Sequence, residues 1–117
     1  MTLNYKSDGK AIIRLPVSEK HKQAFGRVHG GVLAAMLDTA IAVLINQVLG
    51  PDARTTTVEL KVNFLQAATG PHLMAEAGII KLGRTLVIAE AKCYENDILL
   101  VATACGTFYR AAGKWEE

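Results

Sequence analysis

The stretch VHGGVLAAMLD, residues 28–38, combines two features that could do chemistry. His29, Gly30 and Gly31 open an apolar run, and the first N–H groups of a helix have no helical partner and lie at the positive end of its dipole. Such a helix start can stabilise an oxyanion formed from a carbonyl group, and glycine lets a substrate approach the backbone closely. Further along the same run comes Asp38, a lone carboxylate.

Asp38 needs an explanation, because a carboxylate on a buried helix costs free energy unless it is hydrogen-bonded, paired or beside a cavity. One explanation is structural: either Asp38 accepts a hydrogen bond from Thr39 or from a strand threonine, or this face of the helix is exposed to solvent. The other is catalytic, since buried titratable side chains cluster at active sites. The glycines could equally form a steric turn into the helix, and His29 could be a cap or a packing residue.

Gly30 and Asp38 cannot serve the same carbonyl group within one chain. They are separated by roughly 12 Å along the axis at about 1.5 Å per residue, whereas reacting atoms must come within about 3 to 3.5 Å. Two antiparallel copies of the helix across a twofold axis would bring the start of one near the middle of the other. A stripe of small side chains would permit that approach, although it would also fit a tight helix–sheet contact: Gly31, Ala34, Ala35, Asp38 and Ala42.

The element that carries both groups is predicted to be a long helix. Residues 30–49 form a mostly apolar run, and Gly50 followed by Pro51 is a typical helix end. A helix that is apolar nearly all round is buried on most sides. Its large side chains form a stripe at helical spacing that can face a sheet: Leu33, Leu37, Ile41, Leu44 and Val48.

Strands are predicted on both sides of this helix. Period-two patterns and short turns indicate strands at 10–16, 57–65, 72–82, 84–95 and 97–109, the last three as antiparallel neighbours. In the second of these strands, alternation places the apolar residues on one face and the polar residues on the other, namely Val58, Leu60, Val62 and Phe64 against Thr57, Glu59, Lys61 and Asn63. This order predicts one α+β domain over residues 1–117, with an antiparallel β-sheet wrapped around a long central helix. The tail after Tyr109 is expected to be exposed.

Composition disfavours several function classes. The net charge of +2 comes from 13 basic and 11 acidic residues scattered along the chain, without the basic stripe that would indicate a nucleic-acid partner. Cys93 and Cys105 lie in apolar runs outside any metal-ligand pattern, so both are expected to be reduced, packed thiols, and no metal is predicted.

Residues 30–49 approach the length of a membrane span, but no membrane partner is expected. Asp38 near the middle of a bilayer would cost about 2.5 to 3.5 kcal/mol. The first ten residues are polar and lack the apolar stretch of a signal peptide, which favours a cytoplasmic location.

Three stretches resemble one family: GRVHGGVLAAMLDTA, TTTVELKVNFLQAA and IKLGRTLVIAEAKCYENDILLVATACGTFY. They are similar to the hotdog-fold acyl-CoA thioesterases of the phenylacetate-pathway (PaaI-like) type, which include 4-hydroxybenzoyl-CoA thioesterases. The likeness covers nearly all of residues 10–110. The most specific element is HGG followed, nine residues after the histidine, by an acidic residue.

The resemblance implies a hotdog fold that forms dimers and, commonly, tetramers. It also implies that the Gly30 N–H polarises the thioester carbonyl, while Asp38 of the other subunit acts as nucleophile or as general base toward water. His29 belongs to the same motif and is a further catalytic-site candidate, and Gly31 is a candidate for substrate binding. No cofactor is implied, because CoA is part of the substrate.

Two further positions match family residues that assist the reaction. Gln23, six residues before the histidine, stands where the family carries an asparagine or glutamine that holds the carbonyl or the water. Thr57 matches a hydroxyl residue that opens the next strand, with Thr56 as the alternative if the register differs by one. Without the family, Gln23 would be an ordinary loop residue and Thr57 an ordinary strand residue.

The family binds CoA on its surface, with pantetheine running between subunits. Arg84, Lys61 and Asn63 are candidates for contacting it, because arginine and lysine suit phosphate. Each could instead be a solvated surface residue. The phenylacetate branch commonly has asparagine where this chain has Gln23, and the aryl-CoA branch that uses glutamine commonly has glutamate on the helix, so the acyl group stays undecided among small, aromatic and medium-chain groups.

The predicted function is therefore hydrolysis of an acyl-CoA thioester. The same scaffold can host a noncatalytic acyl-CoA-binding module or a dehydratase or hydratase, and a fold alone does not decide between them. The dehydratase reading is weakened because its histidine and acidic partner are not found around His21, His29 or His72.

Overall fold

The computed structural model describes residues 2–6 and 9–111, with side chains described from residue 9 onward. These residues form six strands, one long helix and a short 3₁₀ helix: β1 (Thr2–Lys6), β2 (Lys10–Pro16), η1 (Glu19–His21), α1 (Gly30–Leu49), β3 (Arg54–Phe64), β4 (His72–Leu82), β5 (Leu86–Glu95) and β6 (Leu99–Ala111). The predicted strands at 10–16 and 72–82 and the helix at 30–49 are confirmed in their bounds, whereas the last two strands begin two residues later than predicted. Of the predicted exposed tail, residues 112–117 lie outside the described part.

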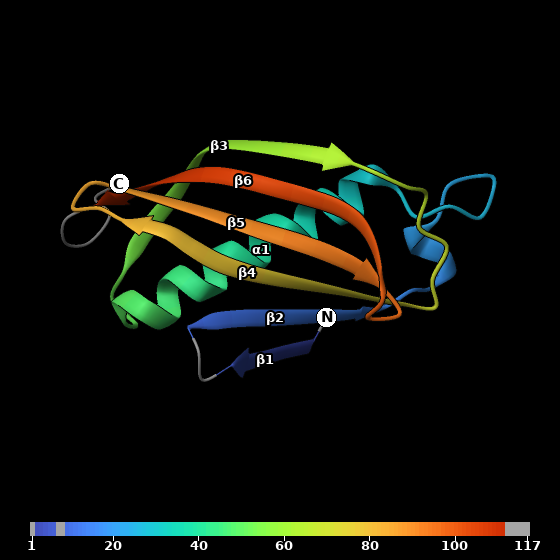
Figure 1. Cartoon of the computed structure of the whole chain (residues 1–117), viewed down its shortest axis with the longest axis horizontal. Helices are drawn as coiled ribbons and strands as arrows, with labels where there is room; N and C mark the ends of the chain where they lie inside the picture. Colours follow the sequence, from blue (N-terminus) through green and yellow to red (C-terminus); the bar gives the residue numbers. More distant parts are fainter. Residues whose placement is uncertain (1, 7–8, 112–117) are drawn as a thin grey trace.

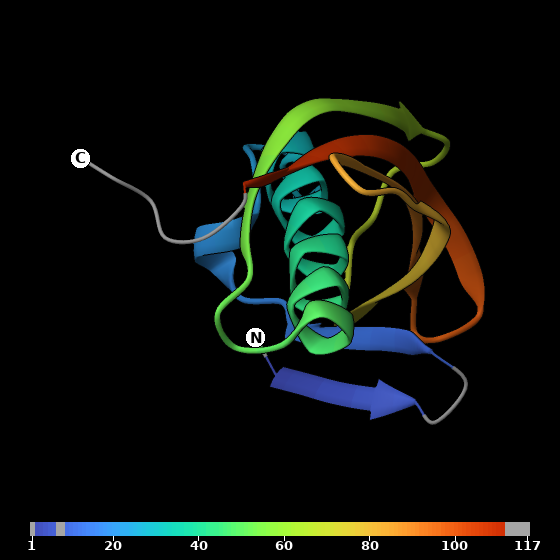
Figure 2. The same ribbon diagram turned by 90° about the vertical axis from the view of Figure 1, so that its left-hand side faces the viewer.

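The strands form one antiparallel sheet in the order β1-β2-β4-β5-β6-β3. It curves around α1, as Figures 1 and 2 show, which confirms the hotdog fold predicted from the sequence. Two features of the sheet were not predicted. β1 was not anticipated, and β3 pairs with β6 rather than with its successor β4, so that β3 lies at the edge of the sheet opposite β1. The chain reaches that edge because α1, which lies between β2 and β3 in the sequence, crosses the concave face of the sheet before β3 begins.

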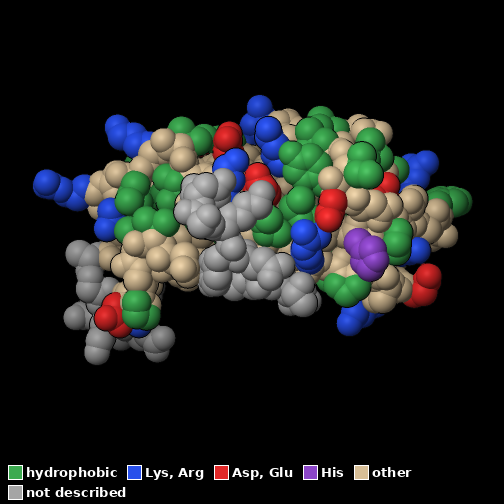
Figure 3. Space-filling model, turned by 60° about the horizontal axis from the view of Figure 1, so that its bottom comes forward, with side chains coloured by type: hydrophobic (Ala, Val, Ile, Leu, Met, Phe, Trp, Pro, Cys, Tyr) green, Lys and Arg blue, Asp and Glu red, His purple; other side chains and the backbone are tan. Residues whose placement is uncertain are grey.

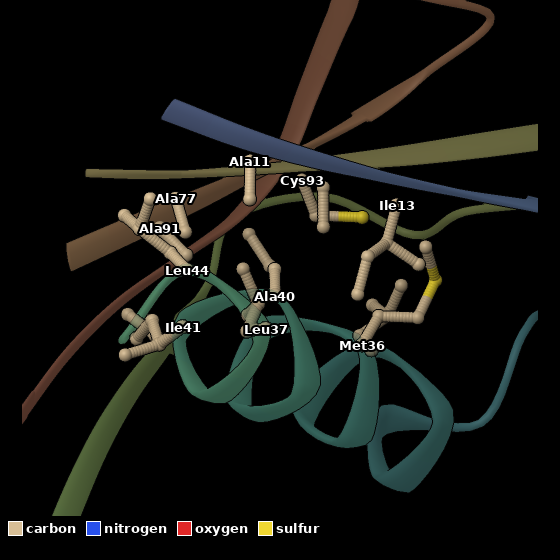
Figure 4. Packing of buried hydrophobic residues seen from close by; sticks show 14 of the residues in the cluster. Ala11, Ile13, Met36, Leu37, Ala40, Ile41, Leu44, Ala77, Ala91 and Cys93 are labelled. Carbon is tan, nitrogen blue, oxygen red and sulfur yellow. The ribbon is translucent and has the colours of Figure 1, made fainter. Parts of the chain in front are cut away.

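The core lies between the helix and the concave face of the sheet. Seven α1 residues are buried, and Leu37, Ala40 and Leu44 point toward the strands in Figure 4. Alanines on the strands, such as Ala77 and Ala91, leave room for this close packing. α1 is long and apolar enough to cross a membrane, but its buried side belongs to this core.

Two predictions about burial are wrong. Val48 is 46% exposed although it continues the large stripe, because the sheet does not cover the last turn of α1. Cys105 is exposed on β6, whereas Cys93 is buried as predicted, and both thiols are free. Burial raises the pKa of the Cys93 thiol to about 12. Figure 3 shows charges of both signs interspersed with apolar groups on one face of the molecule.

A β-bulge in β3 decides which way its side chains point. The register with β6 shifts between Thr57 and Glu59: Thr57 lies opposite the buried Phe108, while Leu60 lies opposite Gly106. The extra residue is Val58, which is 62% exposed. The uninterrupted alternation predicted for this strand is therefore wrong at Thr57 and Val58, because a bulge reverses the faces of the residues before it relative to those after it.

Candidate active site

The first turn of α1 presents free backbone donors. His29 is the N-cap residue, and its carbonyl accepts hydrogen bonds from Val32 N–H at 3.0 Å and Leu33 N–H at 3.3 Å. Its side chain makes no capping hydrogen bond. Neither the Gly30 nor the Gly31 N–H donates to another residue in the described part of the chain. These two N–H groups are therefore available to an acceptor that approaches the helix start.

A pocket of about 350 Å³ opens beside this helix start. It brings together two of the predicted site residues, Gln23 and Gly30. Its other walls come from the segment before the helix, from the first turn of α1 and from the end of β3 with the loop that follows it, namely Arg27, Val28, Leu33, Phe64, Leu65, Gln66, Ala67 and Ala68. Sequence reasoning missed Arg27, and its position next to the HGG motif is the signal that could have indicated it.

The two glycines of the motif have different surroundings. A Cβ on Gly30 would lie 3.3 Å from Cε1 of Phe64, so this glycine lets the aromatic ring close the pocket against the helix start. A Cβ on Gly31 would meet nothing within 4 Å. No packing within the described chain therefore requires a glycine at position 31, and its exposed surface is open to a partner.

Asp38 is held by the strand threonine that the β-bulge turns toward the helix. The Thr57 hydroxyl donates a 2.9 Å hydrogen bond to Oδ1 of Asp38. The carboxylate is half-buried, and the neighbouring Ala35 is exposed. The geometry favours Thr57 over Thr56 as the residue at this position, and it supplies the strand-threonine partner that the structural explanation of Asp38 required. The second Asp38 oxygen has no hydrogen-bond donor among the described residues.

Within one chain the structure does not bring Asp38 to the pocket. Asp38 is not among the residues that line it, and the helix rise separates it from Gly30 by about 12 Å along the axis. The small-residue stripe lies on the side of α1 that the sheet leaves uncovered: Gly31 and Ala35 are exposed, and Ala34, Asp38 and Ala42 are half-buried. The exposure of Ala35 disfavours the alternative in which these alanines serve only to pack against the sheet.

The three candidates for contacting CoA lie away from the pocket. Arg84 belongs to the β4–β5 turn, which lies at the left of Figure 1, whereas α1 begins at the right. Lys61 and Asn63 lie on the face of β3 that points away from the helix, where Asn63 Nδ2 donates a 3.3 Å hydrogen bond to Thr103 Oγ1. None of the three lines the pocket of its own chain.

Comparison with known proteins identifies the family. The family model described as the Thioesterase superfamily matches residues 25–113, so the chain belongs to that superfamily. The prediction of a family of thioester hydrolases is thereby confirmed.

Individual relatives are consistent with this assignment. A 1,4-dihydroxy-2-naphthoyl-CoA hydrolase of Listeria monocytogenes is 31% identical over 98 residues, which cover 83% of this chain and 80% of that protein. A Halobacterium salinarum protein provisionally named an esterase is 36% identical over 89 residues, 72% of this chain, but the chain spans only 58% of its length.

Two solved structures share the fold. A Bacillus halodurans protein crystallised with CoA has a TM-score of 0.88 and 28% identity, covering 97% of this chain and 75% of that chain. A thioesterase enzyme of Staphylococcus aureus has a TM-score of 0.85 and 26% identity, covering 95% of this chain and 93% of that chain. The latter was crystallised as a glutamine-to-alanine variant at its position 32 and as a glutamate-to-alanine variant at its position 47.

Proposed function

We propose that this protein hydrolyses an acyl-CoA thioester to a free acid and CoA. The observation that carries the proposal is the pair formed by Asp38 and Thr57, a carboxylate held by a 2.9 Å hydrogen bond on the open side of a helix whose first N–H groups are free. Hydrolysis of a thioester needs these two elements: a negative charge directed at carbonyl carbon or at water, and donors for the oxyanion.

The proposed site forms between two protomers. Gly30 N–H of one protomer donates to the thioester oxygen, and Asp38 of the other approaches the carbonyl carbon from the opposite side. Gln23 lies in the same pocket as Gly30 and would hold the carbonyl group or the attacking water. The thiolate of CoA leaves as the tetrahedral intermediate collapses, and one water molecule is consumed, either by direct attack on the thioester or by hydrolysis of an anhydride formed with Asp38.

Features of the edge strand β3 support a dimer. Val58, Phe64 and Leu65 are each at least 50% exposed in the single chain, which is unusual for neighbouring apolar side chains. Among the strands of the described residues, β3 has only β6 as a partner, so its other edge offers unpaired backbone groups to a second copy. The small-residue stripe of α1 lets a second helix approach closely.

The Staphylococcus aureus variants support the choice of residues. The two positions substituted there, 32 and 47, are 15 residues apart. Gln23 and Asp38 are separated by the same 15 residues, with the same glutamine-then-acid order. The Bacillus halodurans structure with CoA supports a CoA thioester as the substrate class, and the position of Arg27 in the pocket makes it a candidate for contacting the CoA part.

The decisive experiment measures release of free thiol from a panel of small, aromatic and medium-chain acyl-CoAs. We expect Asp38→Asn to lower kcat by about 10² to 10⁴-fold, the range for loss of a catalytic acid or base. Asp52→Asn, which makes the same chemical change in an exposed turn, should leave kcat unchanged. Equal turnover by wild type and Asp38→Asn would refute the mechanism.

The same panel separates the competing functions. A noncatalytic binding module would bind acyl-CoA tightly without turnover in either form, and a hydratase or dehydratase would change the acyl group while leaving the thioester intact. A single turnover in ¹⁸O-labelled water, together with trapping by hydroxylamine, tests the two roles of Asp38. Label in Asp38, or a hydroxamate formed on Asp38 or on the acyl group from a trapped anhydride, indicates attack by the carboxylate, whereas a general base gives labelled acid, unlabelled protein and no trapped anhydride. A cytoplasmic location stays a prediction.

A further inference from the structure

The loop between β3 and β4, residues 65–71, forms one wall of the pocket, and we call it the pocket loop. Leu65, Gln66, Ala67 and Ala68 line the pocket. The loop lies at the same end of the molecule as the start of α1 and the β5–β6 turn (Figure 1). It has no regular secondary structure of its own, so its position depends on hydrogen bonds to neighbouring segments.

One carboxylate oxygen holds the far half of this loop. Oε1 of Glu95, at the end of β5, accepts hydrogen bonds from Thr69 N–H at 2.6 Å, from Gly70 N–H at 2.8 Å and from the Thr69 hydroxyl at 3.2 Å. Hydrogen bonds to an ionised acceptor are about twice as strong as neutral ones. Burial raises the pKa of Glu95, but the hydrogen bonds from Thr69 and Gly70 together lower it further, so its pKa is below the ordinary value.

The loop is in turn bonded to the segment that begins the helix. The carbonyl of Ala68, the residue before Thr69, accepts a 2.7 Å hydrogen bond from Val28 N–H. Val28 and Ala68 are both buried, at 4% and 1% exposure, so this bond is shielded from water. Val28 is followed by His29, the N-cap of α1, and by Gly30. A path of hydrogen bonds and short stretches of backbone therefore joins Glu95 to the residues that present the free N–H groups.

We propose that Glu95 is a positioning residue for the oxyanion site: it fixes the pocket loop, and through Ala68 and Val28 it fixes the start of α1. This inference rests on the proposed function. Glu95 does not line the pocket, so it acts through the loop rather than on the substrate. Because a misplacement of about 1 Å can cost up to 10²-fold in rate, loss of this carboxylate should weaken catalysis without removing a catalytic group.

Two measurements on the purified full chain test the proposal. The first is hydrolysis of the acyl-CoA that the wild type turns over fastest. We expect Glu95→Ala to lower kcat by about tenfold with a much smaller change in KM, since donors to an oxyanion act mainly in the transition state. Glu95→Gln keeps an acceptor oxygen and should recover part of the loss. Glu90→Ala removes the same charge from an exposed position on the same strand and should match the wild type.

The second measurement is hydrogen exchange of the native protein at pH 7, where Glu95 is charged. Since its folded pKa is lowered, the hydrogen bonds of Glu95 are fully present above its ordinary pKa and are lost only as the pH falls through the lowered value. In Glu95→Ala we expect faster exchange at the hydrogen-bonded N–H groups of residues 65–71 and, within residues 28–31, at those of Val28 and His29, with unchanged exchange in the rest of α1. This pattern would distinguish a local loss of position from a general loss of stability.

The outcomes separate the two proposals. If the wild type hydrolyses no thioester, the proposed function fails, and exchange at residues 28–31 alone then decides whether Glu95 fixes the helix start. If the wild type is active and Glu95→Ala has its kcat, or if exchange at residues 28–31 does not change, Glu95 is not a positioning residue. Equal losses in Glu95→Ala and Glu90→Ala would attribute the effect to net charge and would also overturn the proposal.

Discussion

A mixed dimer of two inactive variants tests most directly whether the sites are shared between protomers. Asp38→Asn removes the carboxylate, and Gly30→Pro removes the N–H donor at the helix start. If each site takes its donor from one protomer and its carboxylate from the other, a dimer of one Asp38→Asn chain and one Gly30→Pro chain holds one intact site. The other site of that dimer carries both defects.

The geometry of the helix start indicates that Gly30→Pro disturbs the fold little. Gly30 is the first helical residue, where proline is well tolerated because the N–H has no helical partner. His29 has φ −58° and ψ 138°, an extended conformation that suits the residue before a proline. The added Cβ would lie 3.3 Å from the Phe64 ring, which is 56% exposed and free to move slightly. Gly30→Ala adds the same Cβ but keeps the N–H, so it is the matched control.

The expected rates follow from the proposed roles of the two groups. Loss of one oxyanion donor lowers kcat by about 10² to 10³-fold, and loss of the carboxylate by about 10² to 10⁴-fold. When the two chains are co-expressed and pair at random, half of the dimers are mixed and half of their sites are intact, so thiol release should return to about a quarter of the wild-type rate. Gly30→Ala should retain most of the activity.

The reasoning is refuted if the co-expressed pair is no more active than either variant alone while dimers containing both chains are present. That result would mean that each protomer uses its own Gly30 and Asp38, which the separation of about 12 Å along one rigid helix forbids for a single carbonyl group. A separate readout is sedimentation: a fully active monomer would contradict the shared site without any substitution.

Three further predictions follow from the described contacts. Thr57→Val removes the 2.9 Å hydrogen bond to Asp38 and should lower kcat by about 3- to 10-fold in the thiol-release assay, as expected for a bond worth about 1 kcal/mol; an unchanged kcat would show that Asp38 needs no positioning. Leu37→Ala, at a fully buried position, should lower the free energy of unfolding by about 2 to 5 kcal/mol in urea titration at fixed protein concentration. Because burial raises the pKa of Cys93 to about 12, a thiol-reactive disulfide should modify Cys105 alone in the folded protein at pH 8 and both cysteines only after unfolding.

The helix was predictable because its sequence signals are local and consistent. Twenty mostly apolar residues are followed by Gly50, whose φ of 99° few other residues adopt, and the observed bounds are those predicted. The β4–β5 and β5–β6 pairs followed from short turns in the same way. The position of β3 could not be predicted, because its pairing with β6 is made across about 45 residues and depends on how α1 crosses the sheet.

The candidate site was predictable in its residue types but not in its assembly. Gln23 and Gly30 share a pocket, and Thr57 contacts Asp38, as proximity to the HGG motif and the family resemblance suggested. Arg84 lies at the opposite end of the molecule from Gly30, so its role depends on a second protomer that no single sequence describes. Glu95 was missed because its partners, Thr69 and Gly70, are about 25 residues away and use backbone N–H groups that leave no mark in side-chain patterns.

The β-bulge in β3 accounts both for the error in the predicted alternation and for the contact between Thr57 and Asp38. Without it, the side chain of Thr57 would share the outer face with Lys61 and Asn63, and Asp38 would have no hydroxyl partner from this strand. The bulge makes Val58 the unpaired residue and turns Thr57 toward α1, while Leu60 and the residues after it keep their apolar face on the helix. A strictly alternating strand can either pack the apolar residues of β3 against the core or place Thr57 beside the Asp38 carboxylate, but it cannot do both. One inserted residue allows both arrangements. This explains why a departure from regular β-structure occurs beside Asp38, the polar residue that the hydrophobic pattern could not account for.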